Sequence, residues 1–379
     1  MEFELTEDQK MLKAMVRDFA EKEIEPIAAR IDEESTFPAE QVKQALALGL
    51  GGVGFPEEYG GSGAGKMGEV VVDEELSRVS ASVDTIIFAS SGLAGYPLYQ
   101  YGNEEQRQRF VVPIATGKKL GCFGLTEAGA GSDVAAMETT ATKKAGGYVL
   151  NGTKIFITNG AEADIALVFA TIDRSLRHRG ITAFIVEKGT PGFSVGKHEH
   201  KLGIRASSTT ELVFEDCFVP EENRLGAEGE GFRIALGSID SSRVSVAAQG
   251  VGIAQAAFEK SLAYAKDRKQ FGQPIAGFQA IQWFLADMAT IIDASRLLTY
   301  RAAYFQDKGL PFVKEAAMAK VYAAEAAMKV TTKAIQIHGG YGFTKDYPVE
   351  RYFRDARILE IYEGTSEMQR MTIARELTR

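Results

Sequence analysis

Residues 148–169 read YVLNGTKIFITNGAEADIALVF, and this stretch decides the fold. It holds three short runs of β-type residues, at 148–150, 155–157 and 165–169. The turn signals Asn151-Gly152 and Asn159-Gly160 separate them, with no segment long enough for a helix between. Further β-type runs lie at 182–186 and 211–214. Strands joined directly by turns predict an antiparallel sandwich or barrel.

The sequence on both sides of this region has the pattern of helices. Thr6 and Gln9 have capping-box spacing ahead of an apolar helical face. Residues 279–308 repeat apolar side chains at three-and-four spacing, and residues 313–337 are rich in alanine and free of proline. Long helices of this kind pack well as an antiparallel bundle. The chain is therefore predicted to be mainly α with a central β domain: an N-terminal helical domain (1–120), a middle β domain (121–231) and a C-terminal four-helix bundle (232–379).

Composition narrows the class of function. The chain has 379 residues, 45% of them hydrophobic, and a formal charge of −8, without a basic block of the kind that nucleic acids require. Cys122 and Cys217 are too far apart in sequence for a metal motif, so no metal site is expected. The first residues do not resemble a signal peptide, and no apolar run approaches the length of a membrane span. These features predict a cytoplasmic protein that acts on small molecules.

Glu363 is the candidate catalytic residue. It lies in Ile361-Tyr362-Glu363-Gly364-Thr365-Ser366, where a single carboxylate has apolar and small neighbours. Such a carboxylate suits a general base, and the adjacent glycine lets another molecule approach. The alternative is a loop that only precedes a helix, because Ser366 and Gln369 also have capping-box spacing.

Two glycine-rich segments are candidate ligand-binding loops, and the case for ligand binding is weaker for the first of them. Gly60 to Lys66 approaches a phosphate-binding loop, but Met67 replaces the required Ser or Thr and no strand precedes it, which favours a turn. Residues 125–133 combine hydroxyl groups and small residues, so their free amides suit a phosphate or a ring edge. An ordinary loop is equally compatible with them. Neither string has the glycine pattern of a nicotinamide-binding fold.

Two segments near helix ends suit a diphosphate-bearing ligand. Arg268-Lys269-Gln270-Phe271-Gly272 places cations and an aromatic residue after a helix, which either offsets the helix dipole or clamps a diphosphate. Residues 336–342 contain more glycines than a helix end needs, which indicates backbone close to a ligand or a flexible turn.

Together these motifs resemble the acyl-CoA dehydrogenase family along the whole chain. The strings at 125–133, 156–160, 268–272, 336–340 and 361–366 occur in the family's order and spacing, and the C-terminal third is most similar to short-chain members. The resemblance implies the same three-part architecture, a homotetramer, and FAD in each subunit.

The resemblance also implies roles for individual residues. Phe123, Leu125, Thr126, Ser132, Phe156, Ile157 and Thr158 are expected to line the flavin and its phosphate region. Those expected to reach FAD across a subunit boundary are Arg268, Phe271, Gln279, Gln336, Gly339 and Gly340, and Thr365 and Glu367 are also expected to contact FAD. Ser132, Asp240, Arg243 and Gly364 are expected to bind substrate, although Arg243 is equally a candidate structural partner of Asp240.

The implied reaction is dehydrogenation of a short, branched or cyclic acyl-CoA, with Glu363 removing the α proton and electrons passing to an electron-transferring flavoprotein. Some members place the base where this chain has Ser242, which cannot serve as one. Asp84 occupies the position where glutaryl-type members have an arginine, so a dicarboxylate substrate is not expected. The alternatives are a flavin-binding assembly or binding module without activity, and an acyl-CoA oxidase.

Overall fold

The N-terminal third is helical, as predicted. The computed structural model describes residues 4–378. In the capping box of the first helix, the Gln9 N–H donates to the Thr6 hydroxyl, and the Gln9 side chain accepts from the Thr6 N–H. The helices are α1 (Glu7–Phe19), α2 (Glu25–Glu34), α3 (Ala39–Ala47), α4 (Gly65–Phe88), α5 (Tyr96–Tyr101), α6 (Glu104–Gln106) and α7 (Val112–Ala115).

The start of α4 explains the false phosphate-loop signal. The Lys66 ammonium group is buried and donates to Glu69 and to the Ser245 hydroxyl. The Lys66 ammonium group is therefore paired with other residues of the protein. The glycines before Lys66 form a turn, as the sequence favoured.

The middle of the chain forms a sheet with the strand order β6-β7-β3-β2-β4-β5-β8. Most neighbours are antiparallel, but β1 and β2 each run parallel to β4, which the turn pattern did not predict. β1 pairs with β4, so β2 and β3 intervene in the sequence between the two paired strands. The strands are β1 (Gly121–Gly124), β2 (Thr140–Lys144), β3 (Gly147–Thr158), β4 (Ile165–Thr171), β5 (Ile181–Glu187), β6 (Phe193–His198), β7 (Thr209–Pro220) and β8 (Arg224–Leu225).

One predicted turn was wrong. Asn151-Gly152 lies inside the single strand β3, where the register with β7 shifts between Leu150 and Gly152. The Asn151 side chain exchanges hydrogen bonds with Asp216 on β7, and Gly152 has a φ of 146°. An Asn-Gly pair can adopt the unusual backbone angles that both a β-bulge and a hairpin turn require. The local sequence therefore does not distinguish a bulge from a turn.

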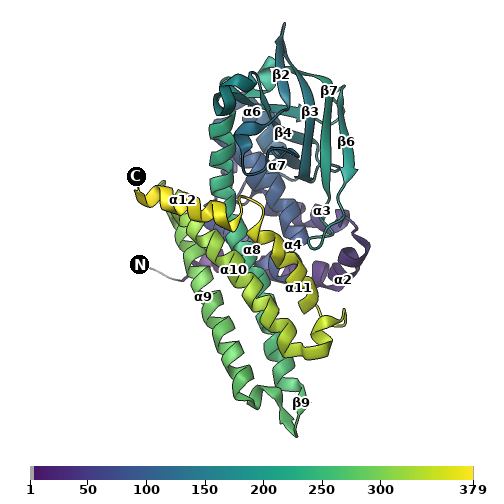
Figure 1. Ribbon diagram of the computed structural model, residues 1–379, viewed down its shortest axis with the longest axis vertical. Coiled ribbons are helices and arrows are strands. Elements are labelled where there is room, and N and C mark those ends of the chain that lie inside the picture. The colour runs from purple at the N-terminus through teal and green to yellow at the C-terminus, as the bar shows by residue number, and fades with distance from the viewer. Residues whose placement is uncertain (1–3, 379) are drawn as a thin grey trace.

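The C-terminal part is helical, with three long helices packed side by side (Figure 1). α8 packs against α4 as well as against the other two, and a small β hairpin marks its far end, away from the sheet. The elements are α8 (Gly231–Asp267), β9 (Lys269–Gln270), β10 (Gln273–Pro274), α9 (Gln279–Asp307), α10 (Val313–His338), α11 (Val349–Ala356) and α12 (Ser366–Thr378).

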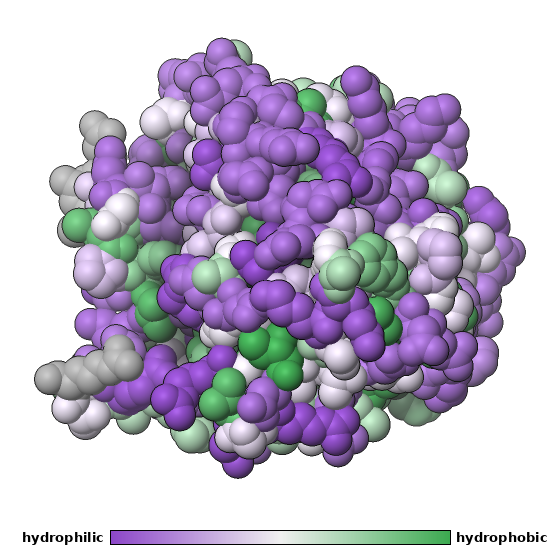
Figure 2. Space-filling model, turned by 90° about the horizontal axis from the view of Figure 1, so that it is seen from above, coloured by the Kyte–Doolittle hydropathy of each residue, from purple (hydrophilic) through white to green (hydrophobic). Residues whose placement is uncertain are grey.

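The apolar cores meet near the end of β1. Phe123 packs against the bundle core and also against the core beneath the sheet. Tyr362 packs against the same bundle core, so the end of β1 and the loop before α12 are brought together. Seen from the end that carries the sheet, the surface is mainly hydrophilic with separate apolar spots (Figure 2). Across residues 4–378, no helix combines the length and apolar character needed to cross a membrane.

Candidate active site

Glu363 lies in a turn with unusual backbone geometry. The turn connects a short 3-10 helix (Arg357–Glu360) to α12. Glu363 has a φ of 53° and Gly364 a φ of 87°, so both adopt the left-handed region. A non-glycine residue there is strained, and such strain is common at functional sites. A Cβ on Gly364 would lie 3.0 Å from Gln369 Nε2 and 3.3 Å from Arg243 Nη2.

Three side chains hold this turn by its carbonyl oxygens. Arg243 Nε donates to the Glu363 carbonyl at 3.2 Å, and Lys320 Nζ donates to the Gly364 carbonyl at 2.7 Å. Gln369 Nε2 donates to both, at 3.0 and 2.7 Å. The Glu363 N–H has no hydrogen-bond partner among residues 4–378. The turn is therefore fixed from its carbonyl side and has a free donor on the other.

The Glu363 carboxylate is paired with Ser242. Ser242 Oγ lies 2.8 Å from Glu363 Oε2 and 2.9 Å from the Ile239 carbonyl. A hydroxyl has one proton, so it donates to the carboxylate when Glu363 is ionised. When Glu363 is protonated, the acid can donate to Ser242 while the hydroxyl donates to Ile239. Ser242 therefore satisfies both protonation states.

Burial raises the pKa of Glu363 above its usual value, while the Ser242 hydroxyl and the Arg243 and Lys320 cations partly oppose that rise. Burial also lowers the pKa of Lys320 to about 8. A carboxylate with a raised pKa is a stronger base. The site therefore strengthens Glu363 as a base and keeps cations near its ionised form.

The capping box considered as the alternative role of this segment does not form at Ser366, and Thr365 caps the helix instead. Thr365 precedes α12 and its hydroxyl accepts from the Met368 N–H at 3.4 Å, while the Ser366 hydroxyl is buried without a partner among the described residues. Gln369 supports the Glu363 turn instead of closing a capping box. Glu367, in the first turn of α12, is exposed.

Asp240 and Arg243 form an ion pair on α8, with 2.6 Å between Asp240 Oδ1 and Arg243 Nη1. Because Arg243 also donates to the Glu363 carbonyl, it supports the base turn directly. Burial raises the pKa of Asp240, against the attraction of Arg243. The structural role that the sequence left open for Arg243 is therefore present.

The loop after β1 is organised by a buried ion pair. Lys154 Nζ on β3 lies 2.6 Å from Glu127 Oε1 and 3.1 Å from the Leu125 carbonyl. Glu127 also accepts from the N–H groups of Glu138 and Thr139. These bonds fasten both ends of the loop to the sheet.

The hydroxyl groups predicted to face the cofactor near the loop after β1 have no hydrogen-bond partner in the described part of the chain. The hydroxyls of Thr126, Ser132 and Thr158 make no side-chain hydrogen bond with any of residues 4–378. Phe156 is 59% exposed with a φ of 58°, so its ring stands out from β3. Ile157 is different, because its side chain lies in the core of the sheet and only its backbone can face a ligand.

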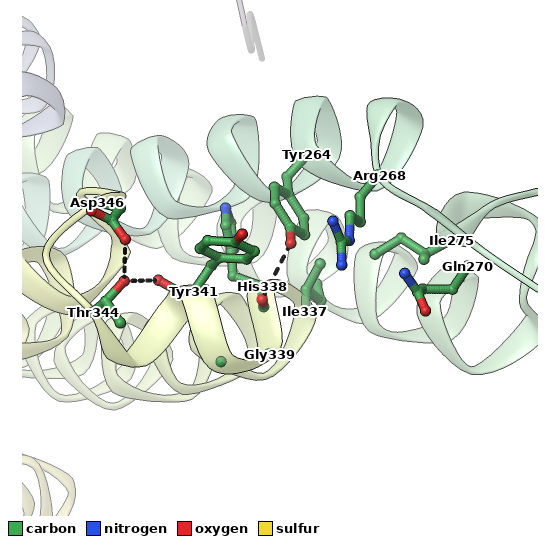
Figure 3. A pocket seen from close by; sticks show the side chains of 11 residues that line it. Tyr264, Arg268, Gln270, Ile275, Ile337, His338, Gly339, Tyr341, Thr344 and Asp346 are labelled. Carbon is green, nitrogen blue, oxygen red and sulfur yellow. Dashed lines mark hydrogen bonds between the residues drawn. The ribbon is translucent and has the colours of Figure 1, made fainter.

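A second group of predicted residues surrounds a hollow at the far end of the bundle (Figure 3). The hollow measures about 460 Å³ and is lined by Arg268, Gly339 and Gly340. A Cβ on either glycine would meet nothing within 4 Å, so the space over this backbone is open. Arg268 stands 5.7 Å from the centre of the Tyr341 ring.

His338 adds an unsatisfied acceptor to the hollow. It is buried and stacks on Tyr264 at 4.3 Å between ring centres. Its Nδ1 pairs with the Ala334 carbonyl at 2.8 Å, whereas Nε2 has no partner among the described residues. Burial lowers the pKa of His338, which favours the neutral ring. A neutral ring that donates through Nδ1 has an acceptor at Nε2, which is buried beside the hollow without a partner among residues 4–378.

The other residues predicted for this group are not part of the lining of the hollow. Phe271, in the turn of the β9–β10 hairpin, is 94% exposed with a φ of 51°. Gln279 is exposed at the start of α9, and Gln336 is in the last turn of α10.

Within one chain, the predicted residues near the sheet and the predicted residues at the hollow do not lie together. Ser242 and Arg268 are 26 residues apart along α8 and its cap, which is about 39 Å of helix. The base turn and the loop after β1 are near the sheet, whereas the hollow lies at the opposite end of the bundle (Figure 1).

The residues present fit a flavin dinucleotide. The loop after β1 offers free hydroxyls and small residues, and β3 adds the exposed ring of Phe156. The hollow offers a guanidinium for phosphate, an open glycine backbone and the orphaned acceptor of His338. The two groups are far apart within a single chain. Among residues 4–378, no cluster of three His, Cys, Asp or Glu side chains is arranged to hold a metal ion.

This fold and site are those of a flavin-dependent acyl-CoA dehydrogenase, and the chain belongs to that family. Its N-terminal, middle and C-terminal domain models match residues 6–118, 122–217 and 229–378. The family consists of oxidoreductases whose cofactor is FAD.

Individual relatives are similar over their full length. The short-chain specific acyl-CoA dehydrogenase of Clostridium acetobutylicum is 51% identical, with all of both chains covered. The acryloyl-CoA reductase (NADH) of Anaerotignum propionicum is 50% identical over 100% of this chain and 96% of its own.

Solved structures agree in fold. Butyryl-CoA dehydrogenase from Megasphaera elsdenii superposes with a TM-score of 0.99 at 47% identity, with 100% of both chains covered. A chain from a structure described as the electron transferring flavoprotein of Acidaminococcus fermentans gives 0.99 at 49% identity, again with both chains fully covered. These comparisons confirm the family and the fold predicted from the sequence.

Three supporting residues could not be identified from the motifs. Lys154, Lys320 and His338 hold the two loops or line the hollow, yet none had been assigned a role. Lys320 had a detectable signal, because it is a lysine on an alanine-rich helix face that is otherwise buried. The others depend on contacts between segments that are distant in sequence.

Proposed function

We propose that this chain dehydrogenates a short acyl-CoA thioester to its 2-enoyl-CoA, with Glu363 as the base that removes the α proton. The observation that carries the proposal is the Glu363 turn. A carboxylate with a raised pKa stands beside a free N–H, in a backbone conformation that three side chains hold in place.

The turn suits removal of a weakly acidic proton. Negative charge develops on the thioester oxygen as the α proton leaves, and a fixed N–H donor lowers the energy of that charge. The Glu363 N–H is available for this role. Ser242 meanwhile accepts a hydrogen bond from the protonated carboxyl group that results. The substrate itself extends past Asp240, Arg243, Gly364 and Ser132 in this proposal.

FAD, when bound, supplies the acceptor for the hydride that leaves the β carbon. We assign it to Phe123, Leu125, Thr126, Ser132, Phe156, Thr158 and the Ile157 backbone of one chain, with Thr365 and Glu367. The second chain contributes Arg268, Phe271, Gln279, Gln336, Gly339 and Gly340. The separation of about 39 Å along α8 supports this division.

The same division supports a homotetramer. Several large apolar side chains are exposed on α9, including Trp283 at 60%, Tyr304 at 52% and Leu297 at 43%. An exposed apolar helix face of this kind is typical of a protein interface. A second copy that covers α9 also brings a second bundle end towards the flavin loop.

We further propose that electrons leave to an electron-transferring flavoprotein. Support comes from the solved relative whose structure is described as such a protein in a study of electron bifurcation. Relatives named for short-chain and butyryl-CoA substrates support a short acyl chain, and branched or cyclic chains extend this substrate class.

An anaerobic titration tests the proposal. The purified protein is expected to be yellow, and butyryl-CoA or cyclohexanecarboxyl-CoA should bleach the flavin band. Glu363→Gln should abolish bleaching and keep the yellow colour, whereas Glu360→Gln, a control carboxylate in the same segment, should bleach normally. Normal bleaching by Glu363→Gln would contradict the assignment of the base.

Two outcomes would replace the proposed function. A flavin that stays oxidised with every straight, branched and cyclic acyl-CoA would favour an assembly or binding module. Production of peroxide in air at the rate of turnover would favour an acyl-CoA oxidase.

A further inference from the structure

A chain of buried polar side chains runs from α4 to the residue that precedes the base. Gln249 on α8 is fully buried, and its Nε2 donates to Asp84 Oδ2 at 2.6 Å and to the Thr85 hydroxyl at 3.1 Å. Its Oε1 accepts from the Tyr362 hydroxyl. The amide thus has one consistent orientation, with its donor towards the carboxylate and its acceptor towards the phenol.

The chain is anchored on a pair of carboxyl groups inside α4. Asp73 and Asp84 are both buried, and Asp73 Oδ2 and Asp84 Oδ1 have no donor partner among residues 4–378. Burial raises the pKa of both, and the pKa of Asp84 is raised further by Asp73. One proton shared between these two oxygens would satisfy both atoms.

Other charged groups lie near the Asp73 and Asp84 carboxyl groups, but none of those in the described part of the chain donates a hydrogen bond to the two unpaired oxygens. Lys66, from the first turn of α4, attracts Asp73 but donates to Glu69 and Ser245. On the opposite side, Tyr362 and Glu363 are the titratable groups of the base turn. No cation among the described residues makes a direct hydrogen bond to Asp84.

Buried polar groups of this kind cost free energy unless all are satisfied. Apolar side chains of similar size would fill the same space between α4 and α8 at less cost. The protein instead has polar side chains here. Through Asp84 and Gln249 they connect α4 to the hydroxyl of Tyr362, the residue directly before Glu363. A strained turn needs such support on its free side, because Arg243, Lys320 and Gln369 hold only its carbonyls.

We propose that Tyr362, Gln249 and Asp84 are positioning residues for Glu363, forming one hydrogen-bonded chain that fixes the direction of the base from the side of α4. This inference rests on the proposed function of Glu363. Tyr362→Phe breaks the chain at the turn, whereas Asp84→Asn preserves it. An asparagine side chain at this position can accept from Gln249 and donate to Asp73.

The matched control is Tyr300→Phe. The hydroxyl of Tyr300 also donates to a buried side chain, in this case the Glu74 carboxylate of α4 at 3.2 Å, but Tyr300 lies on α9 and not in the turn. Both phenylalanine variants should lose similar stability. Only Tyr362→Phe should lower kcat with butyryl-CoA, by about tenfold, with little change in KM. That ratio corresponds to about 1.4 kcal/mol in the transition state.

Three results decide the inference. Asp84→Leu should lose kcat as Tyr362→Phe does, and Asp84→Asn should retain most of it. Equal kcat for Tyr362→Phe and Tyr300→Phe, or an effect on KM alone, would overturn the proposal.

Amide hydrogen exchange of the segment 361–365 provides a readout that does not need activity. Exchange should be faster in Tyr362→Phe and unchanged in Tyr300→Phe. An inactive wild-type protein would refute the proposed function, and this exchange would still decide whether the chain holds the turn.

Discussion

Ser242 Oγ on α8 lies 2.8 Å from Glu363 Oε2, although the two residues are 121 positions apart in sequence. In the sequence, Ser242 is notable only because it replaces the base that some family members place at this position. In the structure it is the direct partner of the base that remains. A serine at this place therefore has a positive role, because its hydroxyl can donate to the carboxylate or accept from the acid.

Ser242→Ala should move the acid limb of the pH profile of kcat/KM to higher pH. The hydroxyl helps to hold down a pKa that burial raises, so its loss raises the pKa of Glu363 further. Activity should then fall more at pH 6 than at pH 9. Ser238→Ala, which removes another buried hydroxyl of α8, serves as the control and should leave the profile unchanged. An unshifted limb in Ser242→Ala would show that the hydrogen bond does not act on the free enzyme.

Lys320→Met should reduce kcat by about tenfold and shift the same limb to higher pH. The ammonium group donates to the Gly364 carbonyl and also lowers the pKa of Glu363. A hydrogen bond from a charged donor contributes about 1.5 to 3 kcal/mol, and 1.4 kcal/mol corresponds to a factor of ten. Lys329→Met, on the same helix, provides a control in steady-state assays. Equal kcat values for the two variants would contradict a role for Lys320 in the turn.

Local patterns predicted those parts of the fold that local energetics determine. The Thr6 capping box, the helix pattern at 279–308 and the helix end near Gly339 all formed as expected. The patterns failed where contacts outside the regular helix or strand decide the outcome. Asn151-Gly152 became a bulge because β7 pairs across it, and Gln369 left its capping role because the carbonyls of residues 363 and 364, in the preceding turn, accept from it.

The site shows the same limit. Motif order was sufficient to select Glu363 and the loop after β1, and a family resemblance supplied the roles. Nothing local to Asp84 indicated a partner on α8, because Gln249 lies 165 residues further on. Polar contacts between helices that are distant in sequence depend on how those helices pack, and no single segment of the sequence specifies that packing.

Asp84→Asn should flatten the pH dependence of stability below neutral pH. The folded pKa of Asp73 is raised from 3.8 to about 7 by burial, and that of Asp84 is raised too. Between about pH 4 and 7 the native pair keeps a proton that the unfolded chain has released. The pair's contribution to stability is therefore complete below pH 4 and declines until about pH 7.

The measurement compares urea unfolding of the wild-type and Asp84→Asn proteins at pH 5 and pH 8. The difference between the two free energies of unfolding at these pH values should be smaller in the variant. An equal pH dependence in both proteins would show that the pair holds no proton in this range.

Lys154→Met should destabilise the protein by about 3 to 5 kcal/mol, because it leaves the Glu127 carboxylate buried without its cation. The pair has side-chain exposures of 0% for Lys154 and 7% for Glu127. The double variant Lys154→Met with Glu127→Gln removes both charges and should recover part of the loss. Chemical unfolding of the three proteins measures this coupling. A single variant as stable as wild type would show that the loop after β1 does not depend on the pair.

Arg268→Met should weaken FAD binding and leave the fold and the oligomer intact. Arg268 is exposed in a single chain, so its loss leaves no buried group unpaired within that chain. In the proposed assembly its guanidinium meets the phosphates of a flavin held mainly by another copy, where a charge-assisted bond is worth about 1.5 to 3 kcal/mol. The ratio of flavin absorbance to protein after dialysis should therefore fall by at least tenfold. Lys266→Met, an exposed cation in the last turn of α8, should keep its flavin. Sedimentation should give the same mass for all three proteins. Full retention of FAD by Arg268→Met would mean that the hollow at the end of the bundle does not belong to the flavin site.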